Sequence, residues 1–244
     1  MQNYKLTLAY DGTRYLGWQR QTDSDSTVQG KLESVLSQLD GSAVETHGSG
    51  RTDAGVHAKG QVVSFSLKTE PDCDTVLSYL RRYLPHDIGA LSVEKADARF
   101  HARLNAKCKT YVYDLWTDPA PCVFERKYVY EFRENLNLTQ MRRAASLLCG
   151  THDFAAFCST KNSKKSTERT IFSIDIEPTA HGLQFTFRGN GFMHHMVRIL
   201  TGTLLEVGKC VRTAESIEAL FYATRNEAGF TVPAKGLCLT EVRY

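Results

Sequence analysis

The chain consists of short amphipathic segments of two kinds. In some, apolar residues recur every second residue, as in a strand, and in others every three to four residues, as in a helix. This pattern restricts the chain to a fold of mixed strands and helices. No uninterrupted apolar run exceeds five residues, the longest being 154–158 and 219–223. A helix that spans a bilayer needs about 20 apolar residues, and the first residues contain no signal-peptide core. We therefore expect neither a membrane protein nor a secreted precursor.

The first half predicts three strands and two helices. Residues 28–39 carry apolar side chains at helical spacing after a capping Thr27, and Gly41 ends this pattern. A second helix opens at Asp72 or Asp74 and stops before Pro85. Two strands are expected from alternating apolar and polar residues, at 4–10 and 61–67, and a third strand is expected at 88–94.

The second half repeats this succession of elements. It begins with a strand at 109–116 and a helix at 138–149 that Gly150 ends. A hairpin follows, with strands at 171–177 and 183–188. Two further helices are expected at 192–207 and 214–223, and a final strand at 237–244. The pattern predicts an α+β fold of two pseudo-repeated subdomains, with mixed, mainly antiparallel sheets flanked by helices. We place the subdomains at residues 1–103 and 104–244.

Charge and cysteine content limit the possible partners and compartment. The formal charge of +3 is too small to indicate nucleic-acid binding by itself, but Lys and Arg cluster at 99–109 and 159–170, where they suit phosphate contacts or form a solvated face. The seven cysteines include no C-x-x-C pair, so they support neither a zinc site nor a redox motif. Reduced, buried cysteines are typical of the cytosol.

The segment 47–58 is the most unusual in the chain, because it holds three glycines in eight residues around Arg51 and Asp53. Glycines allow a ligand to approach the main chain. In an extended loop, side chains two residues apart point the same way, and the arginine favours the ionised carboxylate. Asp53 is therefore a candidate nucleophile or base. The alternative is an Arg51–Asp53 pair that only stabilises a tight loop.

Aromatic residues alternate with bases between residues 100 and 113, a combination that suits an unstacked nucleotide and its phosphates. Tyr111 would supply the flat ring, unless it is a tyrosine of the sheet core. Phosphate contacts are expected for four basic residues, Arg103, Lys107, Lys164 and Lys165.

A third segment, 189–198, places glycines before a helix on which His194 and Arg198 share a face. Adjacent histidines suggest a metal, but on a helix their side chains diverge by about 100°, and no acidic residue lies nearby in the sequence. We therefore expect no metal site. Arg198, close to the buried stripe, needs an anionic partner, for which Asp53 is the candidate.

These segments, together with 10–19 and 233–239, resemble the tRNA pseudouridine synthase A family across essentially the whole chain. The block 50–58, which reads GRTDAGVHA, is the most specific match, whereas Cys210 stands where the family is expected to have glycine. The resemblance implies a pseudouridine-synthase fold and a homodimer that isomerises uridine at positions 38, 39 and 40 of the tRNA anticodon arm. It also implies that Asp53 is the nucleophile, Tyr111 lies against the uracil, Arg198 holds Asp53 and Arg51 displaces the target base.

Such an isomerisation oxidises nothing and adds no outside group, so no cofactor is expected. Two other classes of function stay open for comparison. A non-catalytic RNA-binding module would use Asp53 only to brace its loop, although a carboxylate in a basic groove repels phosphate. An Asp-dependent hydrolase of the retaining glycosidase type needs a second carboxylate, and none lies within the three motif segments.

Overall fold

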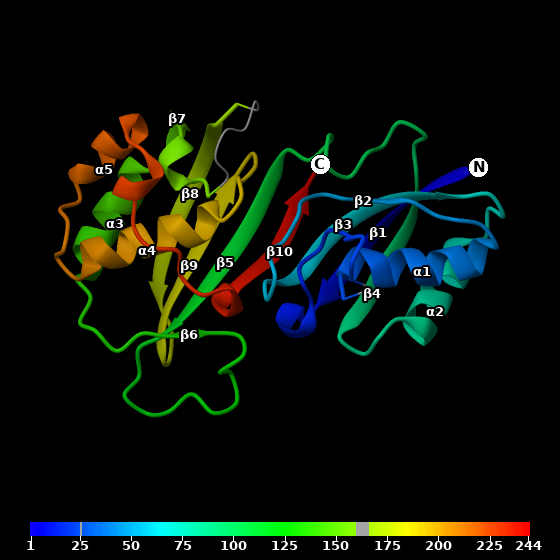
Figure 1. Cartoon of the computed structure of the whole chain (residues 1–244), viewed down its shortest axis with the longest axis horizontal. Coiled ribbons are helices and arrows are strands. Elements are labelled where there is room, and N and C mark those ends of the chain that lie inside the picture. Colours follow the sequence, from blue (N-terminus) through cyan, green and yellow to red (C-terminus); the bar gives the residue numbers. More distant parts are fainter. Residues whose placement is uncertain (25, 160–165) are drawn as a thin grey trace. The chain divides into compact units, whose positions relative to one another are not determined.

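A computed structural model of the chain describes residues 1–24, 26–159 and 166–244 (Figure 1). The chain forms two compact units: the first comprises Met1–Lys107 with Cys238–Tyr244, and the second comprises Cys108–Leu237. This division differs from the expected one in two respects. The first boundary lies after Lys107 instead of residue 103, and the C-terminal strand belongs to the first unit, because it pairs with a strand of that unit's sheet.

The sheet of the first unit is built around β1 (Gln2–Tyr10), which pairs antiparallel with β3 (His57–Leu67) and β4 (Ile88–Ala96). The short β2 (Thr46–Gly48) also pairs antiparallel with β3. The last strand, β10 (Leu237–Arg243), runs parallel to β3, with Cys238 opposite His57. All three predicted strands are confirmed, and β3 begins four residues earlier than expected.

Two helices complete the first unit, α1 (Val28–Asp40) and α2 (Cys73–Tyr83). Their caps are those that the sequence predicts. Oγ1 of Thr27 accepts the Gly30 N–H, Gly41 ends α1 with a φ of 69°, and the Asp72 carboxylate accepts the Thr75 N–H. The apolar faces of strands and helices meet in a core that includes Tyr4, Leu6, Leu8, Leu32, Leu36, Val63, Leu67, Val76 and Leu80.

The strands of the second unit follow the order β5 (Cys108–Trp116), β9 (Gly182–Gly189), β8 (Glu168–Pro178) and β7 (Gly150–Asp153). Each neighbouring pair is antiparallel, and the predicted hairpin is formed by β8 and β9. A two-residue strand, β6 (Tyr130–Glu131), pairs parallel with β5. Each unit therefore holds a mixed, mainly antiparallel sheet, as predicted.

The helices of the second unit are α3 (Leu138–Leu147), α4 (Met196–Gly208) and α5 (Ser216–Ala219). The prediction of a helix over 192–207 is wrong at its start: His195 has a φ of 61°, so regular helix begins only at Met196. The helix expected at 214–223 is also shorter, since a 3-10 turn, Leu220–Tyr222, follows α5. Strand β7 is not predicted; it begins at Gly150, whose φ is 114°.

The structure confirms the α+β class. The largest buried side chains of the second unit come from its strands and the segment before β8, and they include Tyr113, Phe154, Phe157, Phe185 and Phe187. Nowhere in the described part of the chain is a helix both long and apolar enough to cross a bilayer.

Candidate active site

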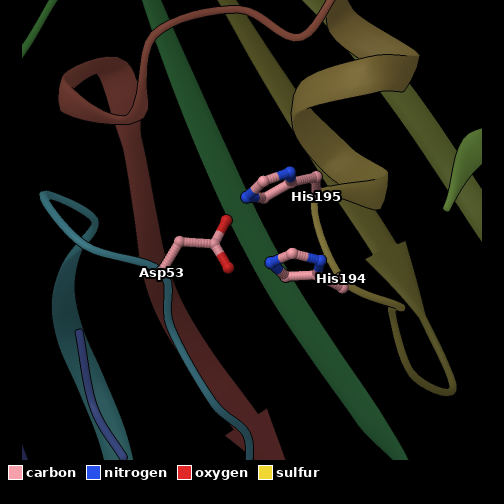
Figure 2. A group of neighbouring side chains, drawn as sticks. All are labelled: Asp53, His194 and His195. Carbon is pink, nitrogen blue, oxygen red and sulfur yellow. The ribbon is translucent and has the colours of Figure 1, made fainter. Parts of the chain in front are cut away.

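Asp53 lies on the loop that connects β2 to β3 in the first unit (Figure 2). Backbone bonds close the loop on itself: the Ser49 N–H donates to the Val62 carbonyl at 2.7 Å, and the Val56 N–H donates to the Asp53 carbonyl at 3.1 Å. Gly55 has a φ of 78°, which glycine tolerates without strain. The glycines that mark this segment in the sequence therefore serve the turn that carries Asp53, whose side chain is half-buried.

The residues after β1 support the other side of this loop. The Trp18 N–H donates to the Thr52 carbonyl at 3.0 Å, and the Gly55 N–H donates to the Tyr15 carbonyl at 3.3 Å. Two glycines permit this approach, because a Cβ on Gly17 would lie 2.7 Å from the Thr52 oxygen and one on Gly12 would lie 2.0 Å from the Val56 oxygen. These backbone contacts fix the loop at Thr52, just before Asp53, and at Gly55, two residues after it.

A buried network of side chains holds the start of the loop. The Tyr10 hydroxyl lies 2.8 Å from Oγ1 of Thr52, the Gln61 amide donates to the Gly50 carbonyl at 2.8 Å, and the Ser49 hydroxyl donates to Oε1 of Gln61 at 2.6 Å. Burial raises the pKa of Tyr10 far above its usual value, so its hydroxyl stays protonated. The side chains that hold the start of the loop are thus neutral hydrogen-bonding groups.

His57 holds the end of the loop. Its buried Nδ1 accepts the Gly12 N–H at 3.1 Å and lies 3.2 Å from Oδ1 of Asp11. The same Asp11 oxygen accepts the Thr13 N–H at 2.9 Å. Sequence reasoning assigned no role to Tyr10, Asp11 or His57. Tyr10 and Asp11 lie in the segment 10–19, which the sequence analysis used only as part of the family resemblance.

Arg51 is exposed, and its guanidinium forms no ion pair or hydrogen bond with any residue that the structure describes. The alternative of an Arg51–Asp53 pair that stabilises the loop is therefore wrong, since the buried network holds the loop. Arg51 accordingly extends from the loop as a cation toward solvent.

Two of the expected phosphate contacts, Arg103 and Lys107, are exposed residues of the first unit. Their backbones are fixed: the Arg103 N–H donates to Nδ1 of His101 at 3.1 Å, and the Lys107 N–H donates to the Arg243 carbonyl at 2.8 Å. The other two, Lys164 and Lys165, lie outside the described residues.

Tyr111 and Tyr113 occupy the same face of β5 in the second unit but differ in their surroundings. Tyr113 is fully buried, and its hydroxyl donates to the Pro233 carbonyl at 2.9 Å. Burial raises its pKa, while the charge of Arg198 acts in the opposite direction. The Tyr111 ring is 7% exposed and makes an edge contact with Phe192 at 5.3 Å between ring centroids. Tyr113 is a core tyrosine, whereas Tyr111 lies next to the loop before α4.

Arg198 lies in the first turn of α4, where its Nε–H donates to the Val232 carbonyl at 2.8 Å. The backbone carbonyl thus gives this half-buried arginine a polar partner within its own unit. His194 precedes the helix, so the expectation that it shares a helical face with Arg198 is wrong. The left-handed conformation of His195 is the reason.

The rings of His194 and His195 stack at 3.7 Å between centroids and do not diverge as they would on a helix (Figure 2). Nδ1 of His195 lies 2.9 Å from the Ser159 hydroxyl. Imidazoles and carboxylates are metal ligands, but within either unit taken alone the described residues bring no three His, Cys, Asp or Glu side chains together. We assign no metal ligand to either unit.

Comparisons with known proteins agree with the resemblance noted in the sequence. The sequence model of the family described as tRNA pseudouridine synthase matches residues 7–105 and 144–244, most of both units. The chain is 44% identical to tRNA pseudouridine synthase A 2 of Bacillus cereus strain ZK / E33L. It is 43% identical to tRNA pseudouridine synthase A 1 of Clostridium tetani and 42% identical to tRNA pseudouridine synthase A of Brevibacillus brevis.

Each of these alignments covers 100% of this chain and 100% of the relative. The similarity therefore includes the loop of Asp53, the strand of Tyr111 and the helix of Arg198 as parts of one continuous match. The chain therefore belongs to the tRNA pseudouridine synthase family, the isomerases that make pseudouridine in tRNA.

Proposed function

We propose that this enzyme converts uridine to pseudouridine at positions 38, 39 and 40 of the tRNA anticodon stem-loop, with Asp53 as the nucleophile. The observation that carries the proposal is the loop of Asp53. Its neighbours on both sides are fixed by hydrogen bonds to buried or backbone groups of the first unit, and the carboxylate itself is half-buried. A nucleophile benefits from such fixed positioning, because less motion must be restricted during the reaction.

The reaction breaks the bond between C1′ of the ribose and N1 of uracil, and rejoins the base through C5. The Asp53 carboxylate adds to C6 of the uracil, attacks C1′ or removes a ribose proton; these three routes stay open. Each requires an ionised carboxylate. In this proposal Arg198 is the cation that keeps Asp53 ionised, and Tyr111 lies against the uracil.

A uridine in the stem must leave the base stack before it can react, which costs a few kcal/mol. Arg51, a cation that extends from the Asp53 loop, is suited to displace the target base or its neighbours. Phosphate contacts from Arg103, Lys107, Lys164 and Lys165 would recover part of this free energy. We extend the proposal to a cytoplasmic homodimer that acts on the anticodon arm without a cofactor.

The test is tritium release from tRNA labelled at uracil C5, because formation of the C1′–C5 bond displaces that hydrogen. Transcripts that carry uridine at only one of the three positions assign the site. Asp53→Asn keeps the size of the side chain but removes its charge. We expect no detectable release, an unchanged melting temperature and tRNA affinity equal to or tighter than that of the wild type, since a negative charge is lost.

Asp23→Asn is the matched control, because it removes one charge from an exposed residue of the same unit. We expect this variant to turn over like the wild type. If Asp53→Asn keeps even about a tenth of wild-type turnover, the role of nucleophile is wrong, and Asp53 only braces its loop.

A further inference from the structure

Two histidines of the first unit form a stacked pair on its surface. The rings of His47 and His101 lie 4.8 Å apart between centroids, with 22° between their planes. His47 is the exposed member, and it points outward because its strand neighbours point inward: Thr46 is buried, and a Cβ on Gly48 would lie 2.6 Å from the Trp18 ring. The exposed His47 ring therefore stacks on the half-buried ring of His101.

The segment that carries His101 is fixed to the same strands. The His101 N–H donates to Oδ1 of Asn105 at 2.7 Å, and the Asn105 N–H donates back to the His101 carbonyl at 3.1 Å. Next to it, the Ala102 N–H donates to the Ser64 hydroxyl at 3.1 Å, and Ser64 lies directly opposite His47 in the pairing of β2 with β3. The backbones that carry His47 and His101 are thus both attached to β3, which holds the two rings side by side.

A hydrogen bond also defines the protonation of His101. Nδ1 of His101 accepts the Arg103 N–H at 3.1 Å, so this nitrogen carries no proton. Burial, and then the charge of His47, lowers the pKa of His101. The His101 ring is therefore neutral above pH 7 and stacks without charge repulsion.

The surroundings of the histidine pair are basic and partly apolar. Arg99, Arg103 and Lys107 are exposed, and no acidic residue occurs from 98 to 107. Leu104, within the same turn, is 77% exposed. Unpaired nucleobases bind flat aromatic faces, while neighbouring cations hold the phosphates on either side.

We propose that His47 and His101 form a platform on which one unpaired nucleobase of the tRNA substrate stacks, against the outer face of His47. The exposed Arg103 beside the platform holds a flanking phosphate. This inference rests on the proposed function, because it takes tRNA as the substrate. It adds a binding residue that is not part of the reacting group around Asp53.

The experiment compares His47→Ala with His47→Phe, which keeps a flat ring but no nitrogen. Base stacking contributes about 1–3 kcal/mol per base, so we expect His47→Ala to weaken tRNA binding by about 5-fold to 150-fold. The KM for tRNA should rise with kcat unchanged, and His47→Phe should restore affinity. His86→Ala, which removes an exposed histidine from the turn before β4, should bind like the wild type.

The melting temperature of each variant verifies that it is folded. Stacking predicts that the salt dependence of binding is the same in all variants, because a stacked base makes no phosphate contact and releases no counterion. If folded His47→Ala binds like the wild type, or if His47→Phe is as weak as His47→Ala and the salt slope falls by about one, the stacking platform is refuted. Failure of the wild type to release tritium would refute the proposed function instead, and binding would still report on the platform.

Discussion

The hydroxyl oxygen of Tyr10 and Oγ1 of Thr52 lie 2.8 Å apart in the interior of the first unit, one residue before Asp53. Tyr10→Phe removes this hydrogen bond and leaves the Thr52 hydroxyl buried without it. We expect the free energy of unfolding to fall by about 1–3 kcal/mol. We also expect kcat to fall while the KM for tRNA changes little, because the displaced group is the candidate nucleophile and not a tRNA contact.

Tyr4→Phe is the control for this prediction. It removes a hydroxyl that donates to the Pro71 carbonyl at 2.5 Å, a bond that does not involve the Asp53 loop. Denaturant unfolding should show a loss of stability in both variants, whereas tritium release should slow only in Tyr10→Phe. Equal kcat values in the two variants would contradict a positioning role for Tyr10.

A second prediction concerns the glycine that lets the segment after β1 reach the Asp53 loop. Gly17 has a φ of 96°, and a Cβ there would lie 2.7 Å from the Thr52 oxygen, which is backbone and cannot rotate away. Gly41, at the end of α1, has a φ of 69° with open space around it. Gly41→Ala should therefore cost only the strain of a left-handed residue, about 1–2 kcal/mol.

Gly17→Ala should cost more than Gly41→Ala and should also reduce turnover, because it displaces the backbone on which Asp53 lies. Thermal unfolding and tritium release measure the two effects. Normal turnover in a folded Gly17→Ala variant would mean that the close approach of these segments is unrelated to the activity.

The sequence predicted most of the fold because local patterns determine it. The caps of α1 and α2 and the alternation in β1 and β5 act within about ten residues. What it missed depends on contacts that are distant in sequence. The support of the Asp53 loop by residues 10–19 comes from backbone approach across about 40 residues. The start of α4 was missed because the apolar Phe192 and Met193 precede the helix and extend its apolar pattern, while His195 is left-handed.

A third prediction uses the buried carboxylate at the end of α1. Burial alone would raise the pKa of Asp40, but hydrogen bonds from Thr69, Ser42 and Lys68 outweigh it and hold the pKa below its usual value. Because the pKa is lowered in the folded state, the stability it contributes is present above the unfolded pKa of about 3.9. That stability is lost as the pH falls through the folded pKa.

Asp40→Asn should therefore lower the free energy of unfolding by about 1–2 kcal/mol at pH 7, because neutral hydrogen bonds replace charge-assisted ones. It should have a smaller effect at low pH, so that the two stability curves converge below about pH 4. Urea unfolding across this range measures the difference. Parallel curves for wild type and variant would show that Asp40 does not contribute to the acid sensitivity of the fold.

The last prediction separates the two tyrosines of β5. Tyr113 is fully buried with a hydrogen bond to the Pro233 carbonyl, so Tyr113→Ala should destabilise the second unit by several kcal/mol, about 3–5 as for other buried aromatic residues. Tyr111 is also buried but lies against Phe192 beside the loop before α4. If its ring stacks on the uracil, Tyr111→Phe should bind tRNA like the wild type, and folded Tyr111→Ala should lose about 1–3 kcal/mol of binding free energy.

Melting curves and tRNA titrations of the variants distinguish a substrate contact from a core residue. Tyr111 is a core residue without contact to the substrate if Tyr111→Ala unfolds like Tyr113→Ala. The same conclusion holds if Tyr111→Ala stays folded and binds tRNA normally.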